Sequence, residues 1–119
     1  FKNIGHFSTV KFAPFNSQNT IFNSEVISKY FLFPFIGRMD DIWASYYVQS
    51  LGFRVIFDKA TVYQDRNQHS FYRDFQGEII GYKNNLNLIL SLKKNPNLIK
   101  NYLPARSYEA FKEYLKIMR

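Results

Sequence analysis

The 119-residue sequence predicts an α/β fold, on the strength of three observations. Apolar residues with helical spacing follow an acidic pair at 40–41, short segments rich in β-branched and aromatic residues flank that helix, and the chain is helical in pattern from residue 70 onward. Too few strands precede the first predicted helix for a complete doubly wound sheet. We therefore expect further strands in sequence upstream of Phe1.

The first elements are short. Residues 7–13 alternate loosely between apolar and polar side chains and predict a strand. Residues 14–19 are rich in turn formers and predict a loop. Residues 20–24 predict a second strand, and Ser24 is the expected N-cap of a helix over 25–32.

The next helix carries the clearest pattern. We expect Asp40 or Asp41 to cap it, and Gly52 occupies the position of a left-handed C-terminal cap. Its predicted core-facing residues recur at spacings of three and four: Trp43, Tyr46, Tyr47 and Leu51.

Residues 53–57 and 60–64 predict two more strands. The helical pattern that follows is expected to be broken, because Gly77 and Gly81 weaken it. Residues 86–92 fit both a strand and a helix period, and the length of the segment favours the helix.

Asn95 and Pro96 are expected to end that helix, and Ser107 is the expected cap of a last one. We divide the chain into an α/β part over 1–69 and a helical C-terminal extension over 70–119 that packs on it.

Composition excludes several classes of protein. With 46% hydrophobic and 19% aromatic residues the chain has enough apolar material for a core. The absence of cysteine excludes disulfides, thiolate zinc sites and a thiol nucleophile. No apolar run is long enough to span a bilayer and no signal segment opens the chain, so the compartment stays open, with the cytoplasm as the default expectation.

The net charge of +7 is unevenly distributed. Residues 83–106 hold five basic side chains and no acid: Lys83, Lys93, Lys94, Lys100 and Arg106. Such a stretch is either a solvated basic face or a surface for an anion, and the pattern alone does not decide between them. Because leucines interrupt the charges, we do not expect specific recognition of nucleic acid.

The acidic pair has two interpretations. One aspartate could cap the helix while the other is solvated. Alternatively, a carboxylate that backbone N–H groups fix at a helix N-terminus could accept a proton from a hydroxyl held in front of it. Arg38, two residues before the pair, could then balance charge or bind a phosphate.

The runs "GRMDDIW" and "QDRNQH" resemble the C-terminal half of nucleotide-sugar glycosyltransferases of the GT-A type. Together with "FAPFNSQNTIFN", these runs are similar to those of the STELLO-like proteins and, more distantly, to those of the reversibly glycosylated polypeptides. The resemblance covers roughly residues 12–82. It implies the C-terminal half of a GT-A fold, with few strands followed by a helical region, and it makes residues 1–69 the acceptor-side part of that fold.

The resemblance also implies roles for single residues. Asp41 matches the acid that is the general base in inverting members, and Asp40 matches the acid that contacts acceptor hydroxyls. His69 falls where a late metal-binding histidine occurs, although a surface histidine is the commoner case. The family carries an earlier Asp-x-Asp element that binds a divalent cation, Mn²⁺ or Mg²⁺, and the donor diphosphate. This chain has no Asp-x-Asp, so the missing N-terminal half is expected to hold most of the cation's ligands.

Other polar residues are candidates for substrate contacts. Asn16, Gln18 and Asn19 carry amides, which offer sugar hydroxyls donors and acceptors together, although turn formation explains them equally well. Arg66 follows a predicted strand and could neutralise a leaving diphosphate.

The resulting hypothesis is part of a metal-dependent glycosyltransferase. It would pass a sugar from a nucleotide-diphosphate sugar to a glycan or another hydroxyl acceptor. The alternatives are a basic anion-binding or nucleic-acid-binding module, whose function would lie at 83–119, and a degenerate transferase domain kept as a scaffold.

Overall fold

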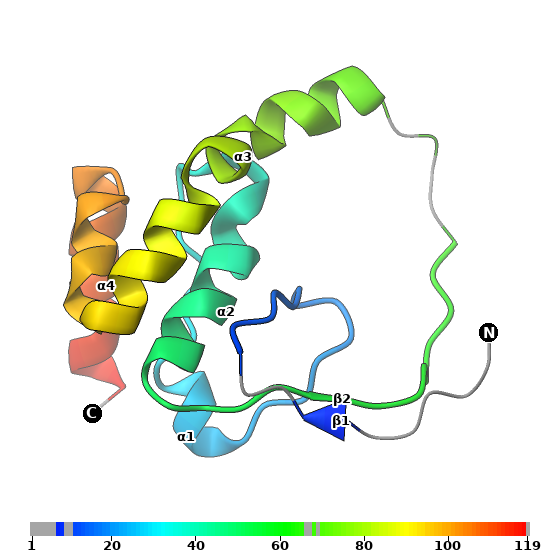
Figure 1. Ribbon diagram of the computed structural model, residues 1–119, viewed down its shortest axis with the longest axis horizontal. Helices are drawn as coiled ribbons and strands as arrows, with labels where there is room; N and C mark the ends of the chain where they lie inside the picture. Colours follow the sequence, from blue (N-terminus) through cyan, green and yellow to red (C-terminus); the bar gives the residue numbers. More distant parts are fainter. Residues whose placement is uncertain (1–6, 9–10, 66–67, 69, 119) are drawn as a thin grey trace.

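Helices make up most of the secondary structure in the computed structural model, which describes residues 7–8, 11–65, 68 and 70–118 (Figure 1). The elements, in chain order, are β1 (Phe7–Ser8), α1 (Ser24–Ile27), the 3₁₀ turn η1 (Gly37–Met39), α2 (Asp40–Ser50), β2 (Ile56–Phe57), α3 (Phe71–Lys94), the 3₁₀ turn η2 (Pro96–Asn101) and α4 (Ala105–Ile117). The strands β1 and β2 pair antiparallel over two residues each, too few to form a sheet layer. The fold is therefore mostly helical, and only the helical part of the predicted arrangement is confirmed.

The predicted strands are shortened or wrong. Within 53–57 only Ile56–Phe57 is a strand, and within the described part of 7–13 only Phe7–Ser8 is one. Residues 20–24 and 60–64 form no strand. A strand needs a hydrogen-bonded neighbour, and β1–β2 is the one ladder that joins the described parts of these segments. Their β-propensity alone does not create strands.

The first helix is shorter than predicted. It covers Ser24–Ile27, and its N-cap is Asn23, whose Oδ1 accepts from the Val26 N–H at 2.8 Å. The prediction of a helix over 25–32 with a Ser24 cap is wrong. The aromatic residues that follow enter the core singly from irregular backbone, and Phe33 is completely buried.

Helix α2 is the centre of the core, as its pattern predicts. Trp43 is completely buried, and its Nε1–H donates to Asn85 Oδ1 at 2.8 Å. Gly52 follows the helix with φ +98°, the left-handed region expected of a C-terminal glycine. Leu51, expected on the buried face, lies past the helix end and is exposed. The other buried apolar residues of α2 are Ala44, Tyr46, Tyr47 and Val48.

Helix α3 runs without a break through Gly77 and Gly81, so the prediction of a broken helix is wrong (Figure 1). The reason is close packing by η1. A Cβ on Gly77 would lie 2.9 Å from Arg38 Cγ, and one on Gly81 would collide with Met39 Sδ. The intrinsic cost of glycine in a helix is about 1 kcal/mol, and the contact with η1 offsets it.

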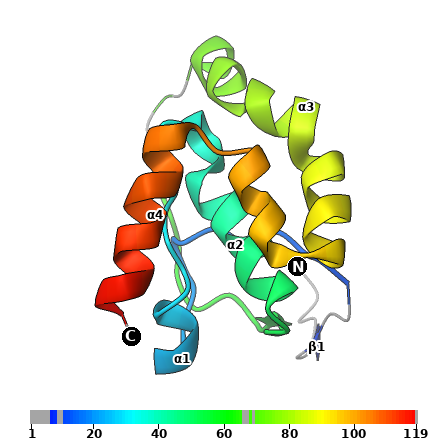
Figure 2. The ribbon, with the colours of Figure 1, turned by 90° about the vertical axis from the view of Figure 1, so that its left-hand side faces the viewer.

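The C-terminal elements largely follow expectation. Residues 86–92 are helical, and Asn95 ends α3. Helix α4 begins two residues before Ser107, which is buried inside the helix and does not cap it. Phe111 fastens α4 to the core, with its ring 5.0 Å from that of Tyr47. Figure 2 shows α4 lying beside η2 and α2.

The core draws on both predicted parts of the chain. Trp43 and Phe33 from the first part belong to one buried cluster with Leu88, Leu92 and Phe111 from the second. The division at residue 69 remains a prediction. No helix among the described residues is long and apolar enough to cross a membrane.

The approach of η1 to α3 should make Gly37 far less tolerant of substitution than Gly52. Both glycines have positive φ, +64° and +98°, so alanine is strained at each by about 1–2 kcal/mol. At Gly37 the new Cβ would also collide with the backbone oxygen of Gly77, whereas at Gly52 it meets open space. We expect Gly37→Ala to lose about 1–3 kcal/mol more unfolding free energy than Gly52→Ala, measured by urea unfolding. Equal losses would contradict the backbone contact.

Candidate functional site

The acidic pair lies in the first turn of α2, and neither aspartate caps it. The N-cap position is Met39, without a side-chain hydrogen bond. The preceding turn η1 already leads the backbone into the helix, with the Met39 N–H donating to the Ile36 carbonyl at 3.4 Å. Asp40 Oδ1 accepts from the Asp41 N–H at 3.0 Å. Both negative charges lie where the helix dipole favours them.

Asp41 binds the loop around Ser17, which lies 24 residues earlier in the chain. Its Oδ2 accepts from the Ser17 backbone N–H at 3.0 Å and from the Ser17 hydroxyl at 3.3 Å. Hydrogen bonds to a charged acceptor are stronger than those between neutral groups. The second aspartate therefore has a definite partner, and the interpretation of a merely solvated neighbour is wrong for Asp41.

Two further side chains of α2 hold the same loop. Ser45 Oγ accepts from the Phe15 N–H at 3.4 Å. The amide of Gln49 forms two bonds with Ala13, accepting from its N–H at 2.9 Å and donating to its carbonyl at 2.8 Å. Asp41, Ser45 and Gln49 together form the α2 polar stripe.

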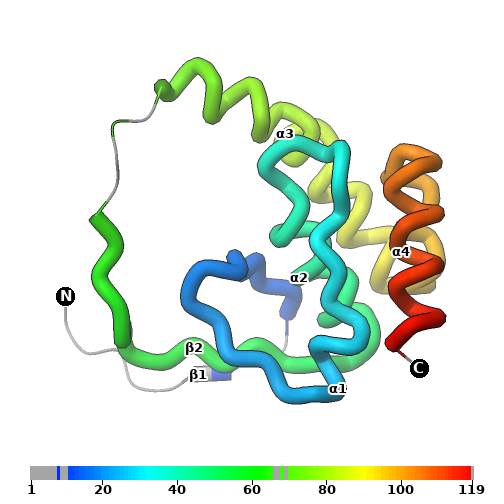
Figure 3. Tube along the Cα trace, turned by 180° about the vertical axis from the view of Figure 1, so that it is seen from behind, coloured from blue at the N-terminus to red at the C-terminus, as the bar shows by residue number. Residues whose placement is uncertain are grey.

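The α2 polar stripe matches the repeat of the chain it holds. Its members are four residues apart, an advance of about 6.0 Å along a helix. Alternate residues of a nearly extended chain are about 6.6 Å apart. Residues 13, 15 and 17 therefore meet three successive turns of α2, in antiparallel order. Figure 3 shows this part of the chain looping beside α2.

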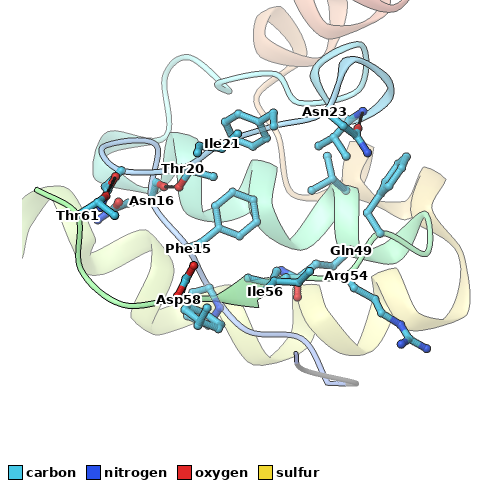
Figure 4. A pocket seen from close by; sticks show the side chains of 18 of the residues that line it. Phe15, Asn16, Thr20, Ile21, Asn23, Gln49, Arg54, Ile56, Asp58 and Thr61 are labelled. Atoms are coloured by element: carbon cyan, nitrogen blue, oxygen red, sulfur yellow. Dashed lines mark hydrogen bonds between the residues drawn. The ribbon is translucent and has the colours of Figure 1, made fainter. Parts of the chain in front are cut away.

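A pocket of 790 Å³ lies between residues 14–23 and residues 53–61 (Figure 4). Its apolar lining includes Phe15 and Phe22 from the first segment and Ile42 from α2. The polar side chains around it are Asn16, Asn19, Thr20, Asn23, Gln49, Arg54, Asp58, Lys59 and Thr61. An apolar surface with several polar groups around it is typical of a small-molecule site.

Two of the three predicted amides belong to this pocket. Asn16 and Asn19 line it, and Asn19 Oδ1 accepts from Thr61 Oγ1 at 3.4 Å across its mouth. Gln18 is exposed and is not part of the lining; its backbone N–H donates to Asn16 Oδ1 at 3.2 Å. Neither Asp40 nor Asp41 is part of the lining. Asp41 is linked to the pocket through its neighbour Ile42, which lines it, and through its partner Ser17, which follows Asn16.

Arg38 lies elsewhere. Its Nη1 is 2.5 Å from Asp74 Oδ1 and its Nε is 3.5 Å from Glu78 Oε1, both on α3. The stem of its side chain covers Gly77. Its contacts are those of a residue that fastens η1 to α3, and the structure does not bring it to the pocket.

Arg66 and His69 lie outside the described residues, so their predicted roles remain predictions. The same holds for the expectation that Asp40, Asp41 and His69 converge on one cleft. Among the residues that the structure does describe, no three His, Asp or Glu side chains come together as metal ligands would.

The basic residues of 83–106 are exposed and spread over α3, η2 and α4. Lys93 and Lys94 form the last turn of α3, where positive charge favours a helix end. Lys93 Nζ lies 5.7 Å from the centre of the Phe12 ring, and Arg106 lies 5.5 Å from that of Phe35. Several of these charges thus have local structural roles.

Sequence reasoning missed Ser17, Ser45 and Gln49. One signal was present: Asp41, Ser45 and Gln49 recur every four residues on a helix, and the positions between them, 42–44 and 46–48, are all aromatic or apolar. Polar residues at a helical spacing beside a buried face are typical of side chains that bind another part of the backbone.

No protein-family model matches the chain, and neither the curated proteins nor the solved structures include a significant match.

Tyr30 links the loop, α1 and the acidic pair. Its hydroxyl donates to the Asp41 carbonyl at 3.4 Å, and its ring stacks on Phe15 with centroids 5.7 Å apart. Burial raises the pKa of Tyr30 well above its ordinary value, and the charges of Asp41 and Asp40 raise it further. The folded protein therefore strongly favours the neutral phenol.

The raised pKa of Tyr30 predicts alkaline loss of stability. Its contribution is complete below the ordinary tyrosine pKa of about 10 and is lost as pH rises toward the higher folded value. Above pH 10 the Tyr30→Phe variant should lose unfolding free energy less steeply than wild type, by up to about 1.4 kcal/mol per pH unit. Urea unfolding at a series of pH values measures the slope. Tyr63→Phe, at a residue 91% exposed, is the control and should keep the wild-type slope. An unchanged slope in Tyr30→Phe would rule out this linkage.

Proposed function

We propose that this chain is the acceptor-side part of a GT-A type glycosyltransferase, which passes a sugar from a nucleotide-diphosphate sugar to a hydroxyl. One observation carries the proposal. The carboxylate of Asp41, at the start of α2, holds the loop whose Asn16 and Asn19 line the 790 Å³ pocket. Asp41 is not itself part of the pocket lining, but it fixes the position of a loop whose amides line a cavity large enough for a sugar acceptor.

Asp41 is our candidate for the general base. It is half-buried and lies in the first turn of α2. Its Oδ2 is engaged by Ser17, so the acceptor proton would go to the other oxygen, Oδ1. The two bonds from Ser17 fix the direction of the carboxylate, which a base in a transfer reaction requires.

The neighbouring polar groups would bind the acceptor. We assign Asp40 to acceptor hydroxyls, together with Asn16 and Asn19, whose amides donate and accept. Arg66 and His69 keep their proposed roles at the leaving diphosphate and the divalent cation. We propose that residues outside the described ones hold that cation and the donor; among the described residues, no three His, Asp or Glu side chains come together.

The rival, a module that binds nucleic acid or another anion, has less support. The five basic side chains of 83–106 lie on three elements, and Lys93 and Arg106 each lie over an aromatic ring of the fold. A reader of nucleic acid needs its cations along one continuous surface.

Asp41→Asn should separate catalysis from loop anchoring in a preparation that contains the donor-binding half. Asparagine keeps an acceptor oxygen for the Ser17 N–H, so folding should change little. It does not accept a proton at neutral pH, and the transfer rate should fall by about a hundred- to ten-thousand-fold. Ser17→Ala is the matched control, because it removes one hydrogen bond to the same oxygen and leaves the carboxylate. The measurement is kcat and KM with a panel of nucleotide-diphosphate sugars and glycans, beside a thermal melt.

The control decides between two roles of Asp41. A large loss of kcat in Asp41→Asn, with near wild-type kcat in Ser17→Ala, is the expected result. Similar small losses in both variants would mean that Asp41 only holds the loop, and the base assignment would then be wrong.

The 119-residue chain by itself should bind nucleotide sugars weakly. The proposal places most contacts with the diphosphate outside the described residues, and their charge is the main source of affinity for such a donor. Calorimetry with several nucleotide-diphosphate sugars in the presence of Mn²⁺ tests this. Tight, metal-dependent binding would contradict the assignment of this chain to the acceptor side.

A further inference from the structure

Helix α3 has a second apolar face that is directed away from the core. Leu88 and Leu92 are buried on one side, beside Gly81. On the opposite side, large apolar side chains are exposed, among them Tyr72 and Tyr82 at 70% and 71% and Leu86 at 71%. Figure 1 shows the N-terminal half of α3 projecting beyond the other helices. A contiguous apolar surface of this kind on a helix indicates a binding face.

The spacing of this face identifies the kind of partner. Five residues follow one another at intervals of three, four, three and four, and we call them the α3 outer stripe: Tyr72, Phe75, Ile79, Tyr82 and Leu86. Within it, the rings of Phe75 and Tyr82 lie 5.8 Å apart. Alternating intervals of three and four are the heptad repeat by which one helix packs along another. A sheet or an irregular peptide does not need this repeat.

The charges beside the α3 outer stripe fit a second copy of the same helix. Glu78 and Lys83 flank the stripe on its two sides and are five residues apart. In a parallel helix pair, the residue before one core position faces the partner residue five positions further along. Glu78 of each copy would therefore face Lys83 of the other, twice by symmetry. An antiparallel pair does not bring these two residues together.

We propose that the α3 outer stripe is a dimerisation surface, on which α3 of a second copy packs in parallel and in register. The pairing needs no rearrangement of the core. Lys83 is exposed. Glu78 accepts from the Tyr82 hydroxyl at 3.2 Å and lies 3.5 Å from Arg38 Nε, while Asp74 holds Arg38 more closely at 2.5 Å. Replacement of Glu78 therefore leaves Arg38 with its nearer partner.

Exchange of the two charges is the sharpest test. In Glu78→Lys the homodimer brings lysine against lysine, and in Lys83→Glu it brings glutamate against glutamate. Mixed together, the two variants form a heterodimer in which both pairs attract. We expect wild type and the mixture to dimerise, and each variant alone to dimerise about ten-fold or more weakly. Sedimentation velocity over a range of concentrations measures this, with circular dichroism to verify folding.

A second pair of variants tests whether the apolar side chains of the α3 outer stripe contribute to dimerisation. Phe75→Ser removes a ring that is 55% exposed, so the fold should persist while dimerisation is lost. Tyr63→Ser removes an aromatic residue that is 91% exposed but lies off α3, and it should leave the dimer intact. A wild-type chain that stays monomeric at every concentration, as would occur if the stripe bound a different protein or a lipid surface, would overturn the proposal.

Cross-linking can show whether the two α3 helices pack in parallel. The chain has no cysteine, so a single introduced cysteine can form a disulfide only with another introduced one. In the proposed dimer Leu86 faces Leu86 and Tyr72 faces Tyr72. Leu86→Cys and Tyr72→Cys should therefore each form a disulfide-linked dimer alone under mild oxidation. Cross-linking only when the two variants are mixed would show an antiparallel pair and overturn the parallel arrangement.

Discussion

The contact between Gly37 and Gly77 is the constraint on which the arrangement of the helices depends. With no Cβ on either residue, the backbone of η1 comes so near to α3 that a methyl group would meet the Gly77 oxygen. Since α2 begins directly after η1, this contact also fixes where Asp40 and Asp41 start the second helix. The ion pair between Arg38 and Asp74 closes over the same contact. An exposed ion pair adds little stability, so shape complementarity of the glycines is the main determinant.

The position of α2 in turn determines the position of the loop at 13–17, because the α2 polar stripe binds its backbone. Asp41, Ser45 and Gln49 hold the backbone of residues 13–17, and this chain in turn forms one side of the pocket. The site is therefore positioned from a buried helix and not by a sheet. In open α/β folds the ends of strands usually place such residues, whereas here the rigid element is α2, whose Trp43 is completely buried.

The sequence predicted those features that depend on residues close together in the chain. The stripe around Trp43 and the cap at Gly52 depend on residues within a few turns, and both were predicted correctly except for Leu51, which is exposed. The strands were not, because residues 53–57 need a hydrogen-bonded neighbour and composition does not reveal whether one is present. The prediction that α3 breaks at Gly77 was wrong for a related reason: Arg38, whose side chain packs on this glycine, is 39 positions earlier in the chain. Asp41 was recognised as unusual, but its partner, 24 residues away, left no local pattern.

The α2 polar stripe holds residues 13, 15 and 17 largely by hydrogen bonds to their main-chain atoms. These bonds therefore depend little on which side chains the loop carries. Pro14 and Asn16 line the cavity and contribute no side chain to the bonds with Gln49, Ser45 and Asp41. Substitution of Asn16 would alter the chemistry of the cavity wall and remove one local bond, from the Gln18 N–H to its Oδ1, while the bonds from α2 to the backbone of residues 13, 15 and 17 remain. The lining of the pocket can thus change in sequence while the backbone bonds to α2, and with them the fold, are kept.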